Sequence, residues 1–429
     1  MDQRYESNGP AVVPNLPPES GQNQERLHAL DAVRGFALLL GIVFHSTMSF
    51  LNSSGRGWLI VDKDPSTTLS VLFYVLHMFR MATFFFIAGF FAHLLFHRRG
   101  QRAFVRDRLR RIGLPLVVGW PFLFASIVGC AIWGAWVMNG GTLPAEPPPD
   151  PNPPLLAFPL THLWFLYVLL WLYALTLLVR AIVTRFDGAG SGRARLDRVV
   201  SGIVRNPFGV LILAAPTCIA LMTLSEWRPW LGIPTPDMTL LPNIAALTAF
   251  GSAFGMGWLM HRQVQLLNVL ETRWPLNLTV AVVATVACLA HVGVIPSVAV
   301  ASRDPLTLAY AASYALAVWC WSFGLIGLAL RFLAGYSAMR RYIADASYWL
   351  YLIHMPIVLV LQILVSQLAW PWWIKFPMIL AIGFPIMFAS YHYLVRSTFI
   401  GAVLNGRRYP RTPMRSSGAA APARMEGTA

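Results

Sequence analysis

The sequence predicts an all-α, polytopic integral membrane protein with about ten transmembrane helices and both termini in the cytoplasm. Of its 429 residues, 56% are hydrophobic and only 12% are charged, whereas soluble domains carry roughly 25% charged residues. The apolar residues also gather in long blocks, which is the pattern of membrane-spanning helices. A chain with so little polar surface cannot face water on all sides, so a soluble globular protein is excluded.

Ten apolar blocks are long enough to cross a bilayer, because a spanning helix needs about 20 residues. They lie at residues 34–52, 69–96, 113–138, 162–183, 207–224, 243–261, 274–293, 308–333, 347–368 and 374–395. The block at 69–96 is long enough to be tilted or broken. These blocks form one membrane domain at 26–400, flanked by tails at 1–25 and 401–429 that are predicted to be disordered.

The distribution of basic residues sets the predicted orientation. The segment 97–112 holds seven arginines and the segment 139–161 holds none. Because Lys and Arg accumulate in cytoplasmic loops, this alternation places both termini in the cytoplasm. The net charge of +15 follows from this topology, so no nucleic-acid partner is expected. The predicted location is the inner (cytoplasmic) membrane of a bacterium, with bilayer lipid as a partner and the oligomeric state left open.

The cysteines give no sign of a metal site or a disulfide framework. All four fall within apolar blocks, and none has Cys-x-x-Cys or metal-ligand spacing; they are Cys130, Cys218, Cys288 and Cys320. We therefore expect no metal and no permanently bound cofactor.

The first block carries two ionisable residues, Arg34 and His45, and such groups are costly inside a membrane. They are eleven residues apart, so on a helix they share a face and lie about 16 Å apart along the axis. Asp31 precedes Arg34 by one turn and is expected to pair with it. Alone, Arg34 fits a cytoplasmic anchor and His45 a packing histidine. The face between them carries Ala37, Leu38 and Gly41, which leave room for a neighbouring helix or a ligand.

Two further pairs of candidate residues lie in other blocks. His77 and Arg80 are three residues apart in "HMFRMATFFFIAGFF", where a buried Arg80 needs a carboxylate, carbonyls or a polar cavity. Gly89 in the same stretch is expected to permit close packing or a bend. His162 and Trp164 begin "HLWFLYVLLWLY", and an ordinary interfacial belt of aromatic residues is an equal alternative there.

Two more pairs lie toward the predicted cytoplasmic side. Ser347 and His354 are seven residues apart in "DASYWLYLIHMP", so they share a helix face, with His354 about 10 Å from the cytoplasmic end. Arg108 and Arg111 are three apart in "FVRDRLRRIGLP", and clustered guanidinium groups suit a polyanionic phosphate. For most arginines of that segment, topology and binding of anionic lipid are the preferred interpretation.

Taken together, these elements resemble the acyltransferase family 3 membrane enzymes. Arg34 and His45, with Asp31 before them, are similar to the first-helix signature of that family, and "RLRR" at 108–111 is similar to its arginine-x-x-arginine element. "SYWLYLIH" resembles its late serine-tyrosine…histidine segment. With "HMFRMATFFFIAGFF" and "HLWFLYVLLWLY", the chain resembles the glucan biosynthesis protein C branch, which is associated with succinylation of osmoregulated periplasmic glucans. The resemblance covers about residues 26–410.

The resemblance implies a ten-helix enzyme that moves a succinyl or acetyl group from acyl-CoA, as co-substrate, to a carbohydrate hydroxyl. It assigns site residues by role: catalysis to His45, Asp31 and His354; binding of acyl-CoA to Arg34, Arg108 and Arg111; and binding of substrate to His77, Arg80, His162, Trp164 and Ser347.

Two routes for the transfer stay open at this point. In the first, His45 is a general base for direct attack by an acceptor that enters from the external side. In the second, His45 or His354 is transiently acylated and relays the group. We favour the first, because the sequence offers no nucleophile elbow or thiol arrangement. The rival function is a transporter or flippase for a glucan or another anion, in which buried Arg and His form a pathway.

Overall fold

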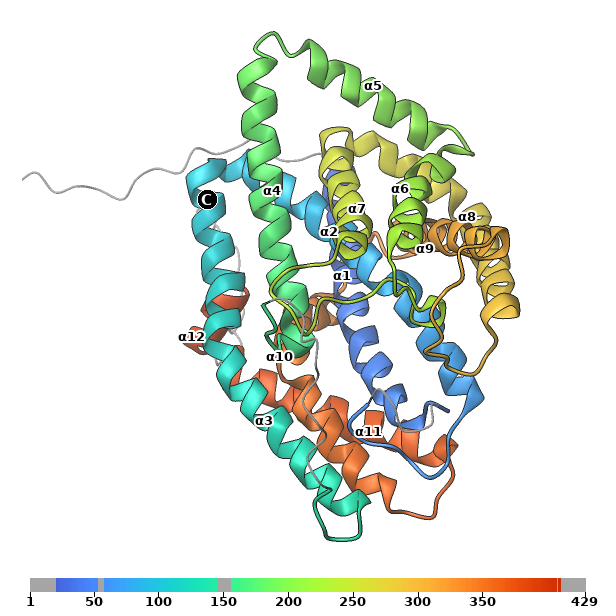
Figure 1. Ribbon diagram of the computed structural model, residues 1–429. Coiled ribbons are helices and arrows are strands. Elements are labelled where there is room, and N and C mark those ends of the chain that lie inside the picture. Colours follow the sequence, from blue (N-terminus) through green and yellow to red (C-terminus); the bar gives the residue numbers. More distant parts are fainter. Residues whose placement is uncertain (1–20, 53–57, 145–155, 407, 410–429) are drawn as a thin grey trace, which may run out of the picture.

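The computed structural model describes residues 21–52, 58–144, 156–406 and 408–409. This part of the chain is a bundle of helices, through which α2 runs as the longest element (Figure 1). Its strand content is limited to one isolated antiparallel bridge between Ala157 and Thr239. The predicted all-α class is confirmed.

Twelve α-helices form the described bundle: α1 (Gly21–Thr47), α2 (Thr67–Arg108), α3 (Leu114–Met138), α4 (Trp164–Phe186), α5 (Ser191–Arg205), α6 (Gly209–Thr223), α7 (Ile244–Arg262), α8 (Leu267–Val292), α9 (Pro305–Phe332), α10 (Ala338–Ser366), α11 (Trp372–Ser390) and α12 (Phe399–Leu404). Short helical turns adjoin them: η1 (Met48–Phe50), η2 (Leu109–Gly113), η3 (Thr161–Leu163), η4 (Pro229–Leu231), η5 (Val264–Leu266) and η6 (Tyr391–Val395). α1 thus begins inside the segment predicted as an N-terminal tail, and residues 1–20 and 410–429 lie outside the described part.

Eight helical stretches of the described chain are long and apolar enough to cross a membrane, or nine if the bent pair α5 and α6 is one span. This is fewer than the ten spans predicted, for two reasons. The predicted blocks 69–96 and 113–138 share one continuous helical stretch, Thr67–Met138, which turns at Gly100 (φ 74°). In addition, α6 has only 15 residues and meets α5 at 103°. The sidedness of the termini stays a prediction.

The close approach of α2 and α7 depends on two glycines. A Cβ atom added at Gly89 would overlap the main-chain oxygen of Phe254, and one added at Gly257 would overlap that of Phe86. Residues without side chains let two helix backbones touch, as is common in membrane bundles. The close packing expected at Gly89 is confirmed. Figure 1 shows α2 running obliquely through the bundle, with α3 returning along its edge.

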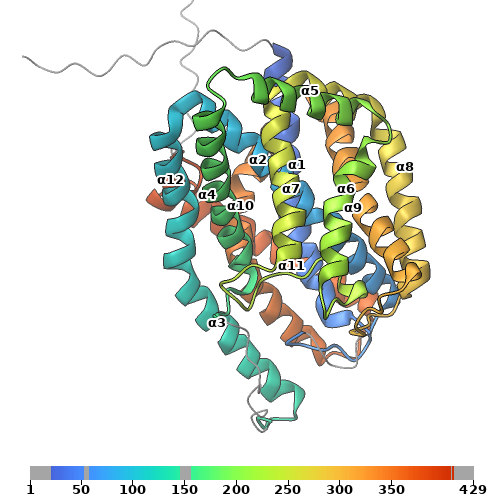
Figure 2. The same cartoon turned by 45° about the horizontal axis from the view of Figure 1, so that its top comes forward.

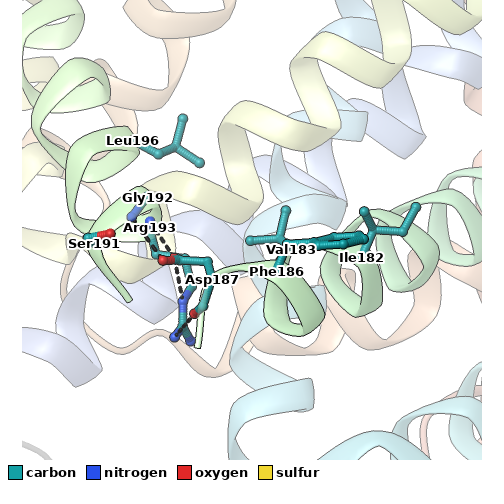
Figure 3. Close-up of a pocket in the computed structure, with 8 residues that line it drawn as sticks. All are labelled: Ile182, Val183, Phe186, Asp187, Ser191, Gly192, Arg193 and Leu196. Atoms are coloured by element: carbon teal, nitrogen blue, oxygen red, sulfur yellow. Dashed lines mark hydrogen bonds and ion pairs between the residues drawn. The ribbon is translucent and has the colours of Figure 1, made fainter. Parts of the chain in front are cut away.

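Helix α5 lies across one end of the bundle (Figures 1 and 2). Asp187, just before it, accepts hydrogen bonds from the backbone N–H groups of Arg193 and Gly192 at 2.8 and 3.0 Å. These bonds lower the pKa of the Asp187 carboxyl. A shallow, mostly apolar hollow of about 510 Å³ separates the end of α4 from the start of α5 (Figure 3). None of the predicted site residues lines this hollow, so the site lies elsewhere.

Candidate active site

Three histidines from three separate elements meet in the bundle. His45 is in the last turns of α1, His354 is in the middle of α10, and His162 is in η3. The ring centroid of His354 lies 5.1 Å from that of His45 and 5.1 Å from that of His162. We refer to His45, His162 and His354 as the histidine cluster. Helices α1 and α10 pack along each other, and this contact brings two of the three rings together.

The hydrogen bonds of the cluster leave one imidazole nitrogen of His354 ready to accept a proton. Its Nδ1 lies 2.6 Å from the main-chain oxygen of Tyr351, and a carbonyl can only accept, so Nδ1 carries the hydrogen. In neutral His354 the lone pair is therefore on Nε2, which is buried without a hydrogen-bond partner. His45 Nδ1 is also buried without a partner. Two neighbouring imidazoles thus each carry an unpaired nitrogen atom.

His162 is held firmly in the same cluster. Its Nε2 lies 3.1 Å from the main-chain oxygen of Leu352, and the hydroxyl of Tyr351 donates to its main-chain oxygen at 2.7 Å. The side chain is only 5% exposed. His162 is therefore an interior residue here, and the interpretation as an interfacial belt does not describe it.

Arg80 from α2 enters the face of α1 that lies between Arg34 and His45. A Cβ atom added at Gly41 would overlap Arg80 Nη1, so the small residue noted in the sequence makes room for this guanidinium. The guanidinium carbon lies 4.6 Å from the ring centroid of Phe44, a cation–π contact. Arg80 Nε is buried without a hydrogen-bond partner, and no described carboxylate forms an ion pair with this side chain.

His77 lies one turn before Arg80 on the same helix and stacks on two phenylalanine rings. Its ring centroid is 5.5 Å from that of Phe44 and 5.7 Å from that of Phe73. His45, His77 and Arg80 are each partly exposed, although their neighbours on α1 and α2 are mostly buried.

The predicted arginines gather beside the middle of α1, about three turns before His45. Asp107 contacts Arg108 at 3.0 Å, Arg111 at 3.6 Å and Arg99 at 3.8 Å, and Arg34 interacts electrostatically with Arg111. We refer to Arg34, Arg108 and Arg111 as the arginine cluster. Since α1 is one uninterrupted helix, the cluster lies about 16 Å along the axis from His45.

Asp31 lies one turn before Arg34, in the same part of α1. It pairs with Arg34 at 3.0 Å, which confirms the expected contact one turn apart, and also with Arg341 of α10 at 3.0 Å. Arg341 in turn contacts Asp345 at 3.4 Å. Asp31 was predicted as a catalytic residue, but these contacts join it to arginines and not to the histidine cluster.

Two further predicted residues lie apart from the histidine cluster. The Trp164 ring stacks on Phe250 of α7 at 5.6 Å between centroids. The Ser347 hydroxyl donates to the main-chain oxygen of Ala344, on its own helix, at 2.9 Å and is buried. Both side chains have packing partners that account for their positions.

Several residues of the site were not identified from the sequence. Asp107 and Tyr351 lie inside quoted motifs, and an acid within a run of arginines was a signal that could have identified Asp107. Trp58 and Gln362, which contact His45, had no signal in the sequence. No group of three or more His, Cys, Asp and Glu residues in the described ranges has the geometry to hold a metal ion.

A family model described as an acyltransferase domain matches residues 27–392, which is most of the chain. The chain belongs to this acyltransferase family. The predicted family resemblance is confirmed, and membership together with the apolar helices identifies a multi-pass membrane protein.

Curated relatives are similar to part of the chain. Glucans biosynthesis protein C from Escherichia coli strain SMS-3-5 is 33% identical over 99 residues, which is 23% of this chain and 25% of that protein. The proteins of the same name from Escherichia coli O1:K1 / APEC and O157:H7 strain EC4115 give the same values. The match therefore spans about a quarter of the length of these relatives. No solved structure matches the chain.

Proposed function

We propose that this protein is an O-acyltransferase of the bacterial inner membrane that moves a succinyl or acetyl group from cytoplasmic acyl-CoA to a carbohydrate hydroxyl. A periplasmic glucan is the acceptor class we favour, because the relatives that share sequence with the chain carry the name glucans biosynthesis protein C. The observation that carries the proposal is the arrangement along α1, with the arginine cluster beside its middle and the histidine cluster about 16 Å further toward its C-terminal end.

The arginine cluster fits the phosphate groups of acyl-CoA. Guanidinium groups bind phosphate oxygens through two parallel hydrogen bonds, which gives both affinity and orientation. Asp107 and Asp31 hold these arginines in place through ion pairs of 3.0 Å. With the phosphates there, the pantetheine arm would run beside α1, past the Arg80 guanidinium at Gly41, toward His45.

The histidine cluster fits a general base for the transfer. A neutral imidazole accepts the proton of the acceptor hydroxyl while the hydroxyl oxygen attacks the thioester carbonyl. The carbon–sulfur bond then breaks, and the CoA sulfur leaves and takes up a proton. We assign the base to His45, with His354 beside it. Arg80 would stabilise the negative charge that develops on the carbonyl oxygen, as a preorganised cation in a site with little water.

A direct test is to purify the protein in detergent and measure release of free CoA from succinyl-CoA and acetyl-CoA, with periplasmic glucan supplied as the acceptor. His45→Ala should abolish release while the protein is still produced and folded, as judged by size-exclusion chromatography. Retained activity in His45→Ala would overturn the assignment. Mass spectrometry of periplasmic glucans from cells with and without the gene identifies the acyl group and the acceptor.

Two further measurements separate this proposal from a transporter and from a route through an acylated histidine. Movement of an unmodified glucan across the membrane of vesicles that contain the protein but no acyl-CoA would favour the transporter. An acyl group found on a His45 or His354 peptide after rapid denaturation would favour the acylated intermediate over direct transfer.

A further inference from the structure

We propose that Trp58 and Gln362 are positioning residues that orient the His45 imidazole. This inference rests on the proposed function, since it concerns the geometry of the base in that reaction. It is drawn from contacts that join three parts of the chain: the end of α1, the segment that follows it, and α10.

Gln362 is fully buried and uses both ends of its amide. Its Nε2 donates to the main-chain oxygen of His45 at 2.9 Å and to that of Ser46 at 3.4 Å. Its Oε1 accepts from the indole N–H of Trp58 at 2.9 Å. Turning the amide over would place N–H groups against the indole N–H and oxygen against two carbonyls, so the partners fix its orientation.

The two carbonyls belong to the last turn of α1, where main-chain oxygens have no partner within the helix. An unpaired carbonyl is costly inside a membrane protein, because no water satisfies it there. Gln362 therefore caps the C-terminal end of α1 and fixes the main chain at His45. Because His354 lies two turns earlier on α10, the same helix positions both imidazoles of the cluster.

Trp58 acts on the imidazole itself. Its ring lies 5.8 Å from that of His45 between centroids, at an interplanar angle of 23°. His45 Nδ1 has no hydrogen-bond partner, so no hydrogen bond of that atom sets the orientation of the ring. The stacked indole, held by Gln362, takes the place of the carboxylate or carbonyl that orients a histidine in many sites. A misplacement of about 1 Å at a reacting group can lower the rate by about 100-fold.

The test compares three variants by CoA release from acetyl-CoA and succinyl-CoA in the purified full-length protein. Trp58→Leu should lower kcat by about 10- to 100-fold, while KM for acyl-CoA changes by less than about twofold. Trp58→Phe keeps a ring over His45 and should recover most of that loss. Trp349→Leu is the matched control, because Trp349 is also half-buried and donates an indole hydrogen bond of 3.0 Å, but to Ser390 of α11. It should lose similar thermal stability and keep its kcat.

A double variant distinguishes failure of this inference from failure of the proposed function. If Trp58 acts through His45, Trp58→Leu has no further effect on the residual rate of His45→Ala. A wild-type kcat in Trp58→Leu, or equal losses in Trp58→Leu and Trp58→Phe, would overturn the positioning role even if His45→Ala is inactive. Full activity of His45→Ala would instead overturn the proposed function.

Discussion

The imidazole rings of His45 and His354 lie with their centroids 5.1 Å apart, although they come from α1 and α10, which are far apart in the sequence. His45 Nδ1 and His354 Nε2 are both buried without a hydrogen-bond partner. Since an unpaired buried polar atom costs about 1–3 kcal/mol, we expect the reacting hydroxyl of the proposed function to complete the hydrogen bonding of one of these atoms.

His354→Gln should therefore lower kcat by about 10²- to 10⁴-fold, the usual contribution of a group that transfers protons. Glutamine fills similar volume and forms hydrogen bonds, but it does not accept a proton at neutral pH. CoA release from acetyl-CoA measures the effect. His291→Gln on the exposed end of α8 is the control and should keep the wild-type rate. Equal rates for His354→Gln and His291→Gln would show that His354 has no part in the reaction.

Gly41→Ala should disturb Arg80 without changing any functional group. The added methyl group overlaps Arg80 Nη1, so the guanidinium must move away from its position above Phe44. We expect kcat to fall by up to about 100-fold, since displaced charge stabilises the transition state poorly. Gly129→Ala in α3 has no atom within 4 Å of the added carbon and should leave activity intact. An active Gly41→Ala enzyme would mean that Arg80 does not take part.

The arrangement along α1 could be predicted from the sequence because it is local. A helix fixes which residues share a face, so the interval between Arg34 and His45 and the pairing of Asp31 with Arg34 follow from 3.6 residues per turn. The apolar blocks also predict the helices, because the length and composition of a spanning helix are local properties of the sequence. These predictions need no knowledge of which helices are neighbours.

The neighbours of His45 could not be predicted, because they depend on packing between distant segments. His162 reaches His354 through a turn in which Thr161 has a positive φ of 52°, a conformation that a β-branched residue rarely adopts. Gln362 has no charge and lies in an apolar run, so no feature of the sequence indicated that it contacts His45. Trp164 and Ser347 lie in the motifs that carry the resemblance; the structure shows their contacts with Phe250 and Ala344, and their role in substrate binding stays a prediction.

Arg108→Gln and Arg111→Gln together should weaken the binding of acyl-CoA, seen as a higher KM, much more than they lower kcat. A hydrogen bond to a charged group contributes about 1.5–3 kcal/mol, so we expect KM to rise by about 10-fold or more. The difference in KM between the double variant and the wild type should shrink as salt rises, because ions screen the attraction between these arginines and the phosphates in the wild type. Exposed Arg195 on α5 offers the control Arg195→Gln. If the wild type, the double variant and Arg195→Gln share one KM, the arginine cluster does not bind the phosphates.

Lys375→Met should destabilise the fold strongly, because it leaves a buried carboxylate without its partner. Lys375 Nζ donates to both oxygens of Asp62 at 2.9 and 3.0 Å, and each side chain is only 1% exposed. Removal of one member of a buried ion pair costs about 3–5 kcal/mol. Thermal unfolding of the protein in detergent measures the loss.

Two comparisons show whether the loss comes from the charge or from the shape. Lys63→Met is the control, because Lys63 is exposed and reaches only the Gln367 side chain, at 3.4 Å; it should unfold at nearly the wild-type temperature. The double variant Asp62→Leu with Lys375→Met replaces the pair by apolar side chains and should recover much of the stability, because no charge is then buried. If the double variant is less stable than Lys375→Met, the pair holds the segment after α1 to α11 by its specific geometry. In that case Trp58, four residues before Asp62, should also lose its place over His45, and kcat should fall with stability.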